Sequence, residues 1–291
     1  MASLKGENSV TDPQRTIAFQ GMPGAYSHAA CKAARPDFEP LACNSFEDML
    51  LSVQEGRAAL AMVPVENSVA GRVADIHHLL PESGLHIIGE HFQRVNHMLL
   101  GLKDAKISDI RSVKSHTHAL AQCRKLIRDL DVLPVISADT AGSAAEIAAA
   151  GDPSVGAIAS ALAAELNDLQ ILRTDVEDAV HNTTRFLIMA RESVIPPLDD
   201  TLYVTTIVFR VRSVPAALYK ALGGFATNGI NLTKLESYLV EGSFSAAQFY
   251  VDAEGHPETS AMKMALEELR FFCPEDAVQI LGTYPAADFR R

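Results

Sequence analysis

Cysteine is scarce and unpatterned in this sequence. The four residues, Cys31, Cys43, Cys123 and Cys273, lie far apart, and neither a CxxC pair nor zinc-ligand spacing occurs among them. We therefore expect small buried hydrophobic residues with no metal or disulfide role. The first 16 residues lack the apolar core of a secretion signal. Together with the cysteine pattern, this indicates a reduced, cytoplasmic protein.

Two further absences exclude broad classes of function. No uninterrupted apolar run reaches the roughly 18 residues of a transmembrane helix, so no membrane-spanning segment is predicted. Basic side chains are outnumbered, with 25 Lys and Arg against 36 Asp and Glu, which gives a formal net charge of −11. This sign disfavours nucleic acids and anionic membrane surfaces as partners.

What remains is the composition of a globular chain of two or three structural units. The 291 residues are 48% hydrophobic and 21% charged, which suits two domains or three lobes. From residue 16 to residue 190, short strand-like segments alternate with helix-like segments. This alternation predicts an α/β domain with parallel strand pairing. Paired prolines and acids within 193–202 then predict a linker.

The last third of the chain has a different pattern. Strand-like segments cover 203–211, 230–240, 243–251 and 278–282, and amphipathic helices are expected after Pro215 and over 258–272. The second and third of these strands are joined around Glu241-Gly242, which is a hairpin signal. The order is βαββαβ, so a ferredoxin-like α+β domain is predicted.

Polar residues interrupt the apolar pattern at four places where a predicted strand ends, and ligands bind at such ends in open α/β sheets. At the first place, Gly24 frees the backbone to approach a ligand. Tyr26 and Ser27 begin a helix whose unpaired N–H groups suit an anion. The segment is also typical of an ordinary connecting turn.

At the second place, Glu66, Asn67 and Ser68 follow an apolar strand, 60–63, that is expected to end at Pro64. Either Asn67 or Ser68 caps a following helix, or the Glu66 carboxyl is desolvated by its apolar neighbours and its pKa is raised. The sequence leaves both interpretations open.

At the third place, Ser115 precedes a predicted helix that carries Gln122, and apolar residues at helical spacing continue this helix to Leu130. His116 and His118 lack an acidic partner at ligand spacing, so we expect solvated histidines and no metal.

At the fourth place, Thr183, Thr184 and Arg185 stand at the start of an apolar strand. Arg185 either binds a carboxylate in bidentate geometry or forms a salt bridge at the sheet edge. A threonine hydroxyl at this position can donate a hydrogen bond into a cleft.

Taken in order, these segments resemble the prephenate dehydratase family. The resemblance rests on GMPGAYSHAA, VPVENSVAGRV, SHTHALAQC and the spacing from Asp178 to TTRF. The later segment VPAALYKALGGFATNGINLTKLES resembles the ACT regulatory domain of that family. The resemblance extends from about Thr16 to Tyr284.

The resemblance implies a catalytic domain over 15–192, with a two-lobed fold like that of periplasmic binding proteins. One lobe is expected from 15–95 plus 175–192 and the other from 96–174, followed by an ACT domain over 203–287. The implied reaction converts prephenate to phenylpyruvate, carbon dioxide and water in phenylalanine biosynthesis, as a carbon–oxygen lyase without metal or organic cofactor. Arogenate dehydratase and a non-catalytic binding protein of the same fold remain as alternatives.

The resemblance assigns the essential hydroxyl to Thr184. Because a neutral threonine is a poor acid, we expect a positioned hydrogen bond to the leaving hydroxyl, and Thr183 points the other way along a strand. The further catalytic positions implied are Glu66, Asn67, Ser115 and Gln122. The substrate-binding positions implied are Arg185, Ser27, Tyr26, Gly24, Thr183 and Ser68.

The resemblance also implies a homodimer or homotetramer with phenylalanine as effector. The implied effector positions are Ala216, Ala217, Leu218, Asn228, Asn231, Leu232, Glu236 and Ser237. Two segments depart from the family pattern: Ala216 replaces the Gly of Gly-Ala-Leu, and Tyr238-Leu239 replaces the Arg-Pro of Glu-Ser-Arg-Pro. We therefore expect a weakened response to phenylalanine. Because every catalytic motif precedes the linker, a fragment that ends near Asp199 is expected to be active.

Overall fold

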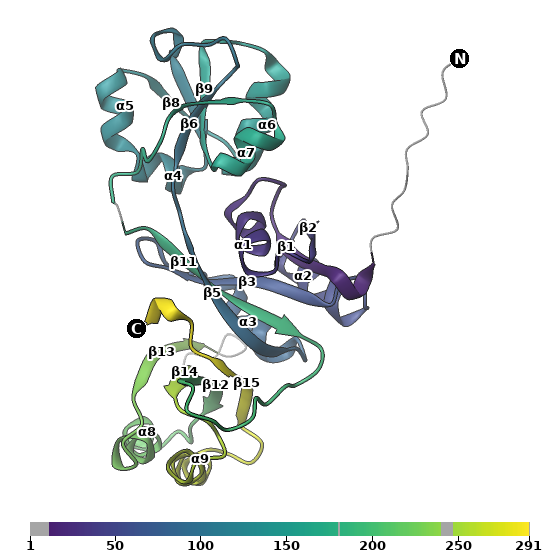
Figure 1. Ribbon diagram of the computed structural model, residues 1–291. Coiled ribbons are helices and arrows are strands. Elements are labelled where there is room, and N and C mark those ends of the chain that lie inside the picture. Colours follow the sequence, from purple (N-terminus) through teal and green to yellow (C-terminus); the bar gives the residue numbers. More distant parts are fainter. Residues whose placement is uncertain (1–11, 180, 240–246, 291) are drawn as a thin grey trace.

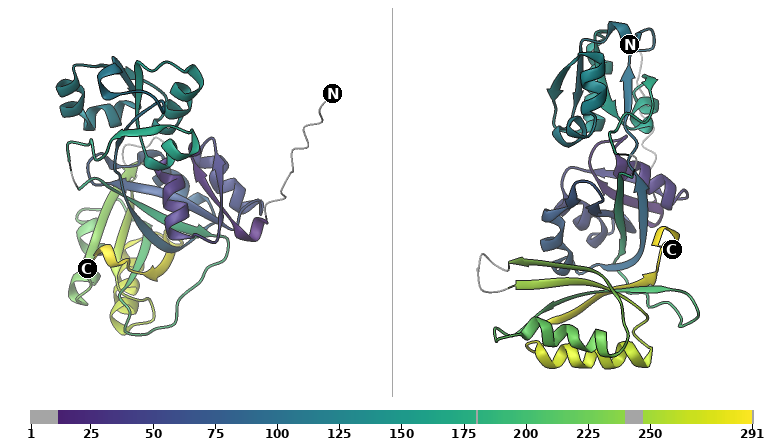
Figure 2. Two further views of the ribbon diagram at one scale, coloured as in Figure 1. Left: turned by 45° about the horizontal axis from the view of Figure 1, so that its top comes forward. Right: turned by 90° about the vertical axis from the view of Figure 1, so that its left-hand side faces the viewer.

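The computed structural model describes residues 12–179, 181–239 and 247–290. Three β-sheets follow one another along the molecule (Figure 1). Sheet B lies at the top of Figure 1, sheet A in the middle and sheet C at the bottom, and the views in Figure 2 show the same stack. This is the predicted α/β protein with two lobes and a C-terminal α+β domain.

Sheet A forms the middle lobe. Its strands are β1 (Thr16–Gln20), β2 (Glu39–Cys43), β3 (Leu60–Asn67), β4 (Gly71–Arg72), β5 (His86–Arg94) and β11 (Thr183–Ala190), and its helices are α1 (Tyr26–Ala34), α2 (Phe46–Gln54) and α3 (Ala74–Glu82). The strand order is β2-β1-β3-β11-β5, and β4 pairs with β3. β1 pairs in parallel with β2 and β3, as predicted, whereas β11 runs antiparallel to both of its neighbours, so the sheet is mixed.

The strand predicted to end at Pro64 continues to Asn67. Its pairing with β11 shifts register there, because Arg185 lies opposite Glu66 while Phe186 lies opposite Pro64. A bulge of this kind tolerates a proline, which lacks the N–H that a regular ladder needs. The residues that follow turn back into β4, so the helix that Asn67 or Ser68 was expected to cap is absent.

Sheet B forms the second lobe, entirely from residues 98–173. Its strands are β6 (Met98–Gly101), β7 (Ser112–Ser115), β8 (Leu133–Ile136), β9 (Val155–Ala159) and β10 (Gln170–Arg173), in the order β10-β6-β9-β7-β8. Its helices are α4 (Thr117–Gln122), α5 (Arg124–Leu130), α6 (Thr140–Ala150) and α7 (Ala161–Leu166). The chain enters this lobe through 95–97 and leaves it through 174–179 and 181–182, and backbone hydrogen bonds join Val95 to Asn182 and Val176 to His97 between these two crossovers.

The single helix predicted after Ser115 is divided in two at Cys123. The Asp178 carboxylate, from the second crossover, accepts hydrogen bonds from the backbone N–H groups of Arg124 and Lys125 at 3.0 and 3.1 Å. A side chain that caps a helix in this way starts a new helix. Because the cap comes from a residue far away in sequence, the helical spacing alone did not reveal the break.

Sheet C forms the C-terminal domain. Its strands are β12 (Tyr203–Arg210), β13 (Leu232–Leu239), β14 (Ala247–Glu254) and β15 (Val278–Pro285), and its helices are α8 (Ala217–Thr227) and α9 (Ser260–Phe272). The antiparallel order β13-β14-β12-β15 is that of the predicted βαββαβ unit. The predicted hairpin at Glu241-Gly242 lies outside the described residues. Short 3₁₀ helices complete the described structure at Pro13–Arg15, Ile107–Asp109 and Asp288–Arg290.

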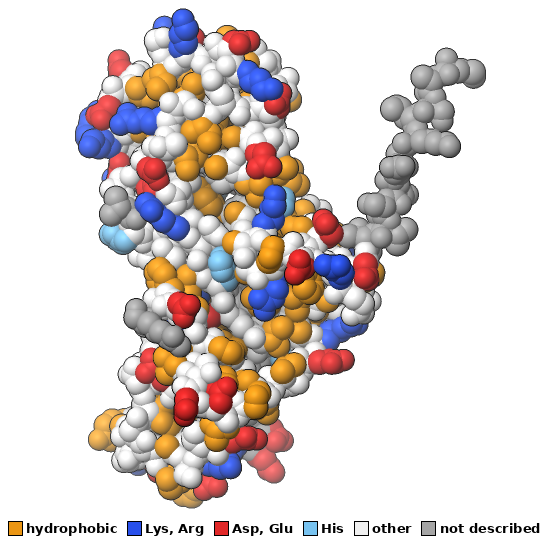
Figure 3. All heavy atoms as spheres, viewed as in Figure 1, with side chains coloured by type: hydrophobic (Ala, Val, Ile, Leu, Met, Phe, Trp, Pro, Cys, Tyr) orange, Lys and Arg blue, Asp and Glu red, His pale blue; other side chains and the backbone are white. Residues whose placement is uncertain are grey.

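The surface carries charges of both signs. On the face shown in Figure 3, basic and acidic side chains are interspersed over the upper lobe, and acidic ones are prominent on the lowest domain. Within the described part of the chain, none of the helices has the length and apolar character needed to cross a membrane.

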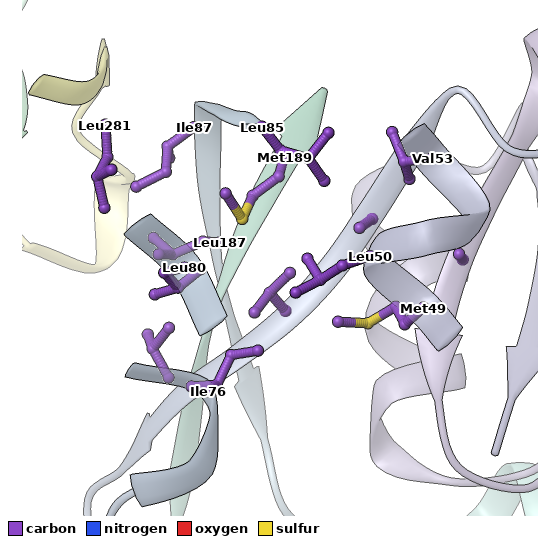
Figure 4. Packing of buried hydrophobic residues seen from close by; sticks show 14 of the residues in the cluster. Met49, Leu50, Val53, Ile76, Leu80, Leu85, Ile87, Leu187, Met189 and Leu281 are labelled. Carbon is purple, nitrogen blue, oxygen red and sulfur yellow. The ribbon is translucent and has the colours of Figure 1, made fainter. Parts of the chain in front are cut away.

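Sheet C packs directly on the sheet A lobe. One hydrophobic cluster joins Leu80 and Ile87 of that lobe to Val204, Tyr250 and Leu281 of sheet C, and all five side chains are buried. Figure 4 shows Leu281 beside Ile87. Helices α8 and α9 cover the opposite face of the sheet (Figure 1). The contact is therefore a continuous core and not a loose junction between domains.

This core changes the expectation for the fragment that ends near Asp199. Cutting there exposes the apolar face of the sheet A lobe to water. The free-energy cost is about 25 cal/mol for each Å² of apolar surface exposed. We expect the fragment to melt well below the full chain in a thermal denaturation experiment and to lose activity on heating at a lower temperature. A fragment as stable as the full chain would contradict the packing argument.

Candidate active site between the two lobes

The Thr184 hydroxyl lies beside Asn67 on the sheet A lobe. The two residues face each other across the β3–β11 pair, and Asn67 Nδ2 donates a hydrogen bond to Thr184 Oγ1 at 2.9 Å. Side chains alternate along a strand, so this pair occupies one face of the sheet while its neighbours Glu66 and Arg185 occupy the other.

The orientation of the Asn67 side chain is fixed by the backbone. Its Oδ1 accepts hydrogen bonds from the N–H groups of Val69 and Ala70 at 3.0 and 2.8 Å. Its Nδ2 must therefore supply both donors, one to Thr184 Oγ1 and one to Asn182 Oδ1 at 2.7 Å. Because Thr184 Oγ1 acts as the acceptor in this contact, its own proton is available to a substrate.

From Asn182 the hydrogen bonds continue across both lobes. Asn182 Nδ2 donates to Gln122 Oε1 at 2.9 Å, and the same oxygen lies 3.0 Å from His97 Nε2. His97 Nδ1 lies 2.9 Å from the Tyr26 hydroxyl. Gln122 ends α4 of the sheet B lobe and Tyr26 begins α1 of the sheet A lobe, whereas Asn182 and His97 belong to the two crossovers. The chain of hydrogen bonds thus ties the lobes together at their junction.

Sequence reasoning missed His97 and Asn182, although each is only 2% exposed. Asn182 immediately precedes the two threonines, and its position beside them was the available signal. His97 stands alone before an apolar strand, and no sequence pattern distinguishes it. Burial lowers the pKa of His97, against opposing effects from Gln122 and Glu177, which favours the neutral imidazole.

Gly24 brings the two lobes into contact. Its φ of +94° is one that L side chains rarely adopt, and a Cβ there would lie 2.8 Å from Ala163 Cα of α7. Its carbonyl also accepts a hydrogen bond from the Ser160 hydroxyl at the start of that helix. Gly24 was predicted to let the backbone approach a ligand. In the structure it lets the backbone of the sheet A lobe approach α7 of the sheet B lobe.

The remaining predicted serines differ in their surroundings. Ser115 is fully buried and donates to the carbonyl of Ile158 at 2.6 Å, which joins β7 to β9. Ser68 donates to the carbonyl of His181 and accepts from the backbone N–H of Thr183, which fixes the start of β11. Ser27 lies partly exposed in the first turn of α1.

Arg185 does not face the junction between the lobes. Its side chain is 2% exposed and uses four of its five N–H donors within the protein. Nε donates to Glu90 at 2.8 Å, Nη1 to Glu66 at 3.0 Å and Asp252 at 2.6 Å, and Nη2 to the Tyr284 hydroxyl at 3.0 Å.

The expectation that Arg185 binds a substrate carboxylate is therefore wrong for this structure. Strand alternation places it on the face opposite Thr184, against sheet C. The same alternation sends Glu66 toward Arg185 and toward Lys234, whose Nζ lies 2.7 Å from the Glu66 carboxylate. Burial opposes ionisation of Glu66, but Lys234 and Arg185 outweigh it and lower its pKa. The alternative of a raised Glu66 pKa is also wrong.

The predicted effector residues fall into three places on the chain. Ala216, Ala217 and Leu218 line a surface hollow of about 820 Å³ at the start of α8, together with Val214 and Phe249. Asn228, Asn231 and Leu232 lie at the other end of that helix. Arg72 of the sheet A lobe contacts the Glu236 carboxylate and the backbone carbonyl of Ser237. Within one chain these residues do not form a single site.

The two departures from the family segments have distinct structural settings. Ala216 adopts the left-handed conformation, with φ of 60° and ψ of 20°, which glycine adopts without the steric penalty of a Cβ. Tyr238 is buried between sheet C and α3, and its ring meets that of His78 edge-on at 5.0 Å. Tyr238 therefore belongs to the contact with the sheet A lobe and not to the hollow.

Residues that could hold a metal ion are not gathered anywhere in the described ranges, where groups of three or more His, Cys, Asp or Glu side chains with suitable geometry are lacking. The four cysteines are buried and unpaired. Burial raises the pKa of the Cys31 and Cys123 thiols, so they are poor nucleophiles.

Fold and site together define a two-lobed α/β enzyme domain that is followed by a ferredoxin-like α+β domain. The model of the prephenate dehydratase family matches residues 17–194, and the chain belongs to this family.

Three relatives show how far the similarity extends. The chain is 54% identical, over 96% of its length and 98% of the relative's, to the bifunctional N-acyl-homoserine lactone acylase/prephenate dehydratase of Komagataeibacter europaeus. It is 39% identical, over 94% of its length and 73% of the relative's, to arogenate dehydratase/prephenate dehydratase 1 of Arabidopsis thaliana. The crystal structure of the Arthrobacter aurescens prephenate dehydratase in complex with L-Phe superposes with a TM-score of 0.84. That structure is 31% identical and the match covers 94% of this chain and 90% of that one.

The setting of Arg185 predicts a stability defect. Arg185→Leu leaves three carboxylates without their buried partner, and breaking a buried ion pair typically costs about 3–5 kcal/mol. We expect a large fall in the melting temperature. Arg57→Leu is the control, because Arg57 pairs with Asp48 and Glu55 on the surface and such pairs contribute little. A stable Arg185→Leu protein whose only defect is a raised KM would restore the substrate-binding role.

Proposed function

We propose that this protein converts prephenate to phenylpyruvate with loss of carbon dioxide and water. The observation that carries the proposal is the Thr184 hydroxyl, whose proton is left available by the fixed Asn67 donor. Membership of the prephenate dehydratase family supports it. We also propose the boundaries expected from the sequence, with the catalytic domain over 15–192, the linker over 193–202 and the regulatory domain over 203–287.

In this reaction the ring carboxylate leaves as carbon dioxide, and its bonding electrons move into the ring. The ring hydroxyl leaves from the opposite carbon and takes up a proton to become water, so the ring becomes aromatic. Thr184 donates a hydrogen bond to the departing oxygen as negative charge develops on it. Positioned donors of this kind contribute roughly 10²–10⁴ in rate.

The substrate is a dianion, and Arg185 is not available to bind it. Other donors must take that role, because the protein as a whole has a net charge of −11. The amide nitrogen of Gln122 is suited to it, since the Gln122 oxygen already accepts two hydrogen bonds. The first turn of α1, with Ser27, adds free backbone N–H groups at the same junction.

Prephenate and arogenate differ only in the side chain, which carries a keto group in one and an amino group in the other. The deciding experiment incubates purified protein with each compound and measures phenylpyruvate and phenylalanine formation. We expect faster turnover of prephenate. Faster turnover of arogenate would reverse the substrate assignment, and turnover of neither would favour a non-catalytic binding protein.

A second candidate activity is hydrolysis of N-acyl-homoserine lactones. The observation that favours it is the 54% identity to the Komagataeibacter europaeus protein, whose name includes this activity. The buried cysteines provide no nucleophile for it. Incubation with acyl-homoserine lactones of several chain lengths, followed by mass spectrometry for free homoserine lactone and fatty acid, tests this activity independently of prephenate turnover.

The two threonines give the sharpest test of the catalytic assignment. We expect Thr184→Ala to lower kcat by at least about 10²-fold with a smaller change in KM, because the hydroxyl acts in the transition state. Thr183→Ala is the matched control and is expected to be milder, since Thr183 lies on the other face of the strand. Equal losses in the two variants would contradict the assignment of Thr184.

We propose in addition that phenylalanine binds the regulatory domain of a homodimer or homotetramer and inhibits the reaction. The hollow beside Ala216 supports this, because the N-terminus of α8 suits a carboxylate and Val214 and Phe249 suit an apolar ring. The phenylalanine complex of the Arthrobacter aurescens relative supports the choice of ligand. Inhibition requires that phenylalanine bind one arrangement of subunits more tightly than another.

Ala216 is expected to weaken this inhibition. Ala216→Gly removes the cost of a left-handed alanine, about 1 kcal/mol, and lets the backbone approach the ligand more closely. We expect phenylalanine to inhibit the Ala216→Gly variant at lower concentrations than the wild type, measured as initial rate against phenylalanine concentration. Tight inhibition of the wild type, with no stronger inhibition of the variant, would show that Ala216 does not weaken phenylalanine binding.

A further inference from the structure

His97 is buried where the chain first crosses from one lobe to the other. Its ring contacts Gln122 through Nε2 at 3.0 Å and Tyr26 through Nδ1 at 2.9 Å. Its backbone N–H donates to the Glu177 carboxylate of the second crossover at 2.8 Å. His97 thus contacts both lobes and both crossovers at once.

We propose that His97 is a positioning residue for the dehydratase reaction. In the Nε2–H tautomer it holds the carboxamide of Gln122 so that the amide nitrogen of Gln122 is directed to the substrate. This inference rests on the proposed function for its kinetic consequences, although the tautomer itself can be observed without any substrate.

The hydrogen bonds from Asn67 to Gln122 all run in one direction. The backbone N–H groups of Val69 and Ala70 fix Asn67 Oδ1 as an acceptor, so Asn67 Nδ2 donates to Asn182 Oδ1. Asn182 must then use its own amide nitrogen toward Gln122 Oε1. The main chain thus fixes which atom of Asn67 donates, and this fixes the donor and acceptor atoms of Asn182 and Gln122 in turn.

The tautomer of His97 follows from the orientation of Gln122. Gln122 Oε1 carries no hydrogen, so the contact at 3.0 Å requires a proton on His97 Nε2. In the neutral ring Nδ1 is then an acceptor, and the Tyr26 hydroxyl can donate to it. That hydroxyl also donates to the backbone carbonyl of Asn96 at 2.7 Å, so its single proton is shared between two acceptors.

These hydrogen bonds also fix the orientation of the Gln122 carboxamide. Its oxygen receives two donors, one from each crossover, and both lone pairs are used. Its amide nitrogen is consequently left without a partner in this chain of bonds and is available as a donor. If the His97 donor is lost, the carboxamide can rotate by 180° and present its oxygen to an anionic substrate, which would repel it.

The test compares two replacements of His97 that differ in where they place a donor. Glutamine can place its amide nitrogen near the position of Nε2, whereas asparagine reaches only the position of Nδ1. We expect His97→Gln to keep kcat within about threefold of the wild type and His97→Asn to lower kcat by about tenfold or more. His256→Asn is the control, since His256 is equally buried but contacts the carbonyl of Pro196 in the linker; it should leave kcat within about twofold.

Nuclear magnetic resonance of ¹⁵N-histidine-labelled wild type reads the tautomer directly, with His97→Gln identifying the signal. A protonated Nε2 and an unprotonated Nδ1 are expected, and the reverse pattern would overturn the proposal whether or not the protein turns over prephenate. Equal activity of the two His97 variants, both near or both far below wild type, would also overturn it.

If His97→Asn does not fold, Tyr26→Phe decides instead. This change preserves the ring of residue 26 and removes only the hydroxyl that can donate to His97 Nδ1 and so support the tautomer that Gln122 requires; we therefore expect a lower kcat and a mixture of both tautomers in the spectrum. An unchanged tautomer with unchanged kcat would count against the proposal. A wild type inactive toward prephenate and arogenate would defeat the proposed function while leaving the spectroscopic result to stand on its own.

Discussion

The buried guanidinium of Arg185 is the interaction on which the rest of the structure depends. It satisfies Glu66 and Glu90 of the sheet A lobe and Asp252 of sheet C at the same time. A closed ring of hydrogen bonds runs from Arg185 through the Tyr284 and Thr206 hydroxyls to Asp252 and back. Buried charges are stable only when they are paired and hydrogen-bonded. Separating sheet C from the sheet A lobe would therefore leave carboxylates unpaired or exposed to water.

This arrangement gives the β3–β11 pair two faces with different roles. One face carries Asn67 and Thr184 toward the junction of the lobes, and the other carries Glu66 and Arg185 toward sheet C. The bulge beside Glu66 is where the register of the pair shifts. A displacement of sheet C would therefore act on the residues directly behind the proposed catalytic pair, and a link between sheet C and that pair needs no long pathway.

Several elements followed from local sequence. The βαββαβ order and the place of Thr184 at the start of a strand depend on residues near one another in the chain, and the sequence patterns predicted them. Other elements were set by distant residues. Asp178 divides the helix after Ser115, and the partner of His97 lies 25 residues away in the opposite lobe. Local periodicity carries no information about such contacts.

Arg185 shows most clearly what the sequence alone could not predict. By itself the sequence determined that an arginine follows Thr184 on a strand, and strand alternation already implied that the two side chains point in opposite directions. Which direction faces the junction of the lobes and which faces sheet C was decided only when two other strands, β5 and β14, brought Glu90 and Asp252 to the same point. The physical reason is that a guanidinium binds whichever carboxylates surround it, and those neighbours are a property of the folded chain.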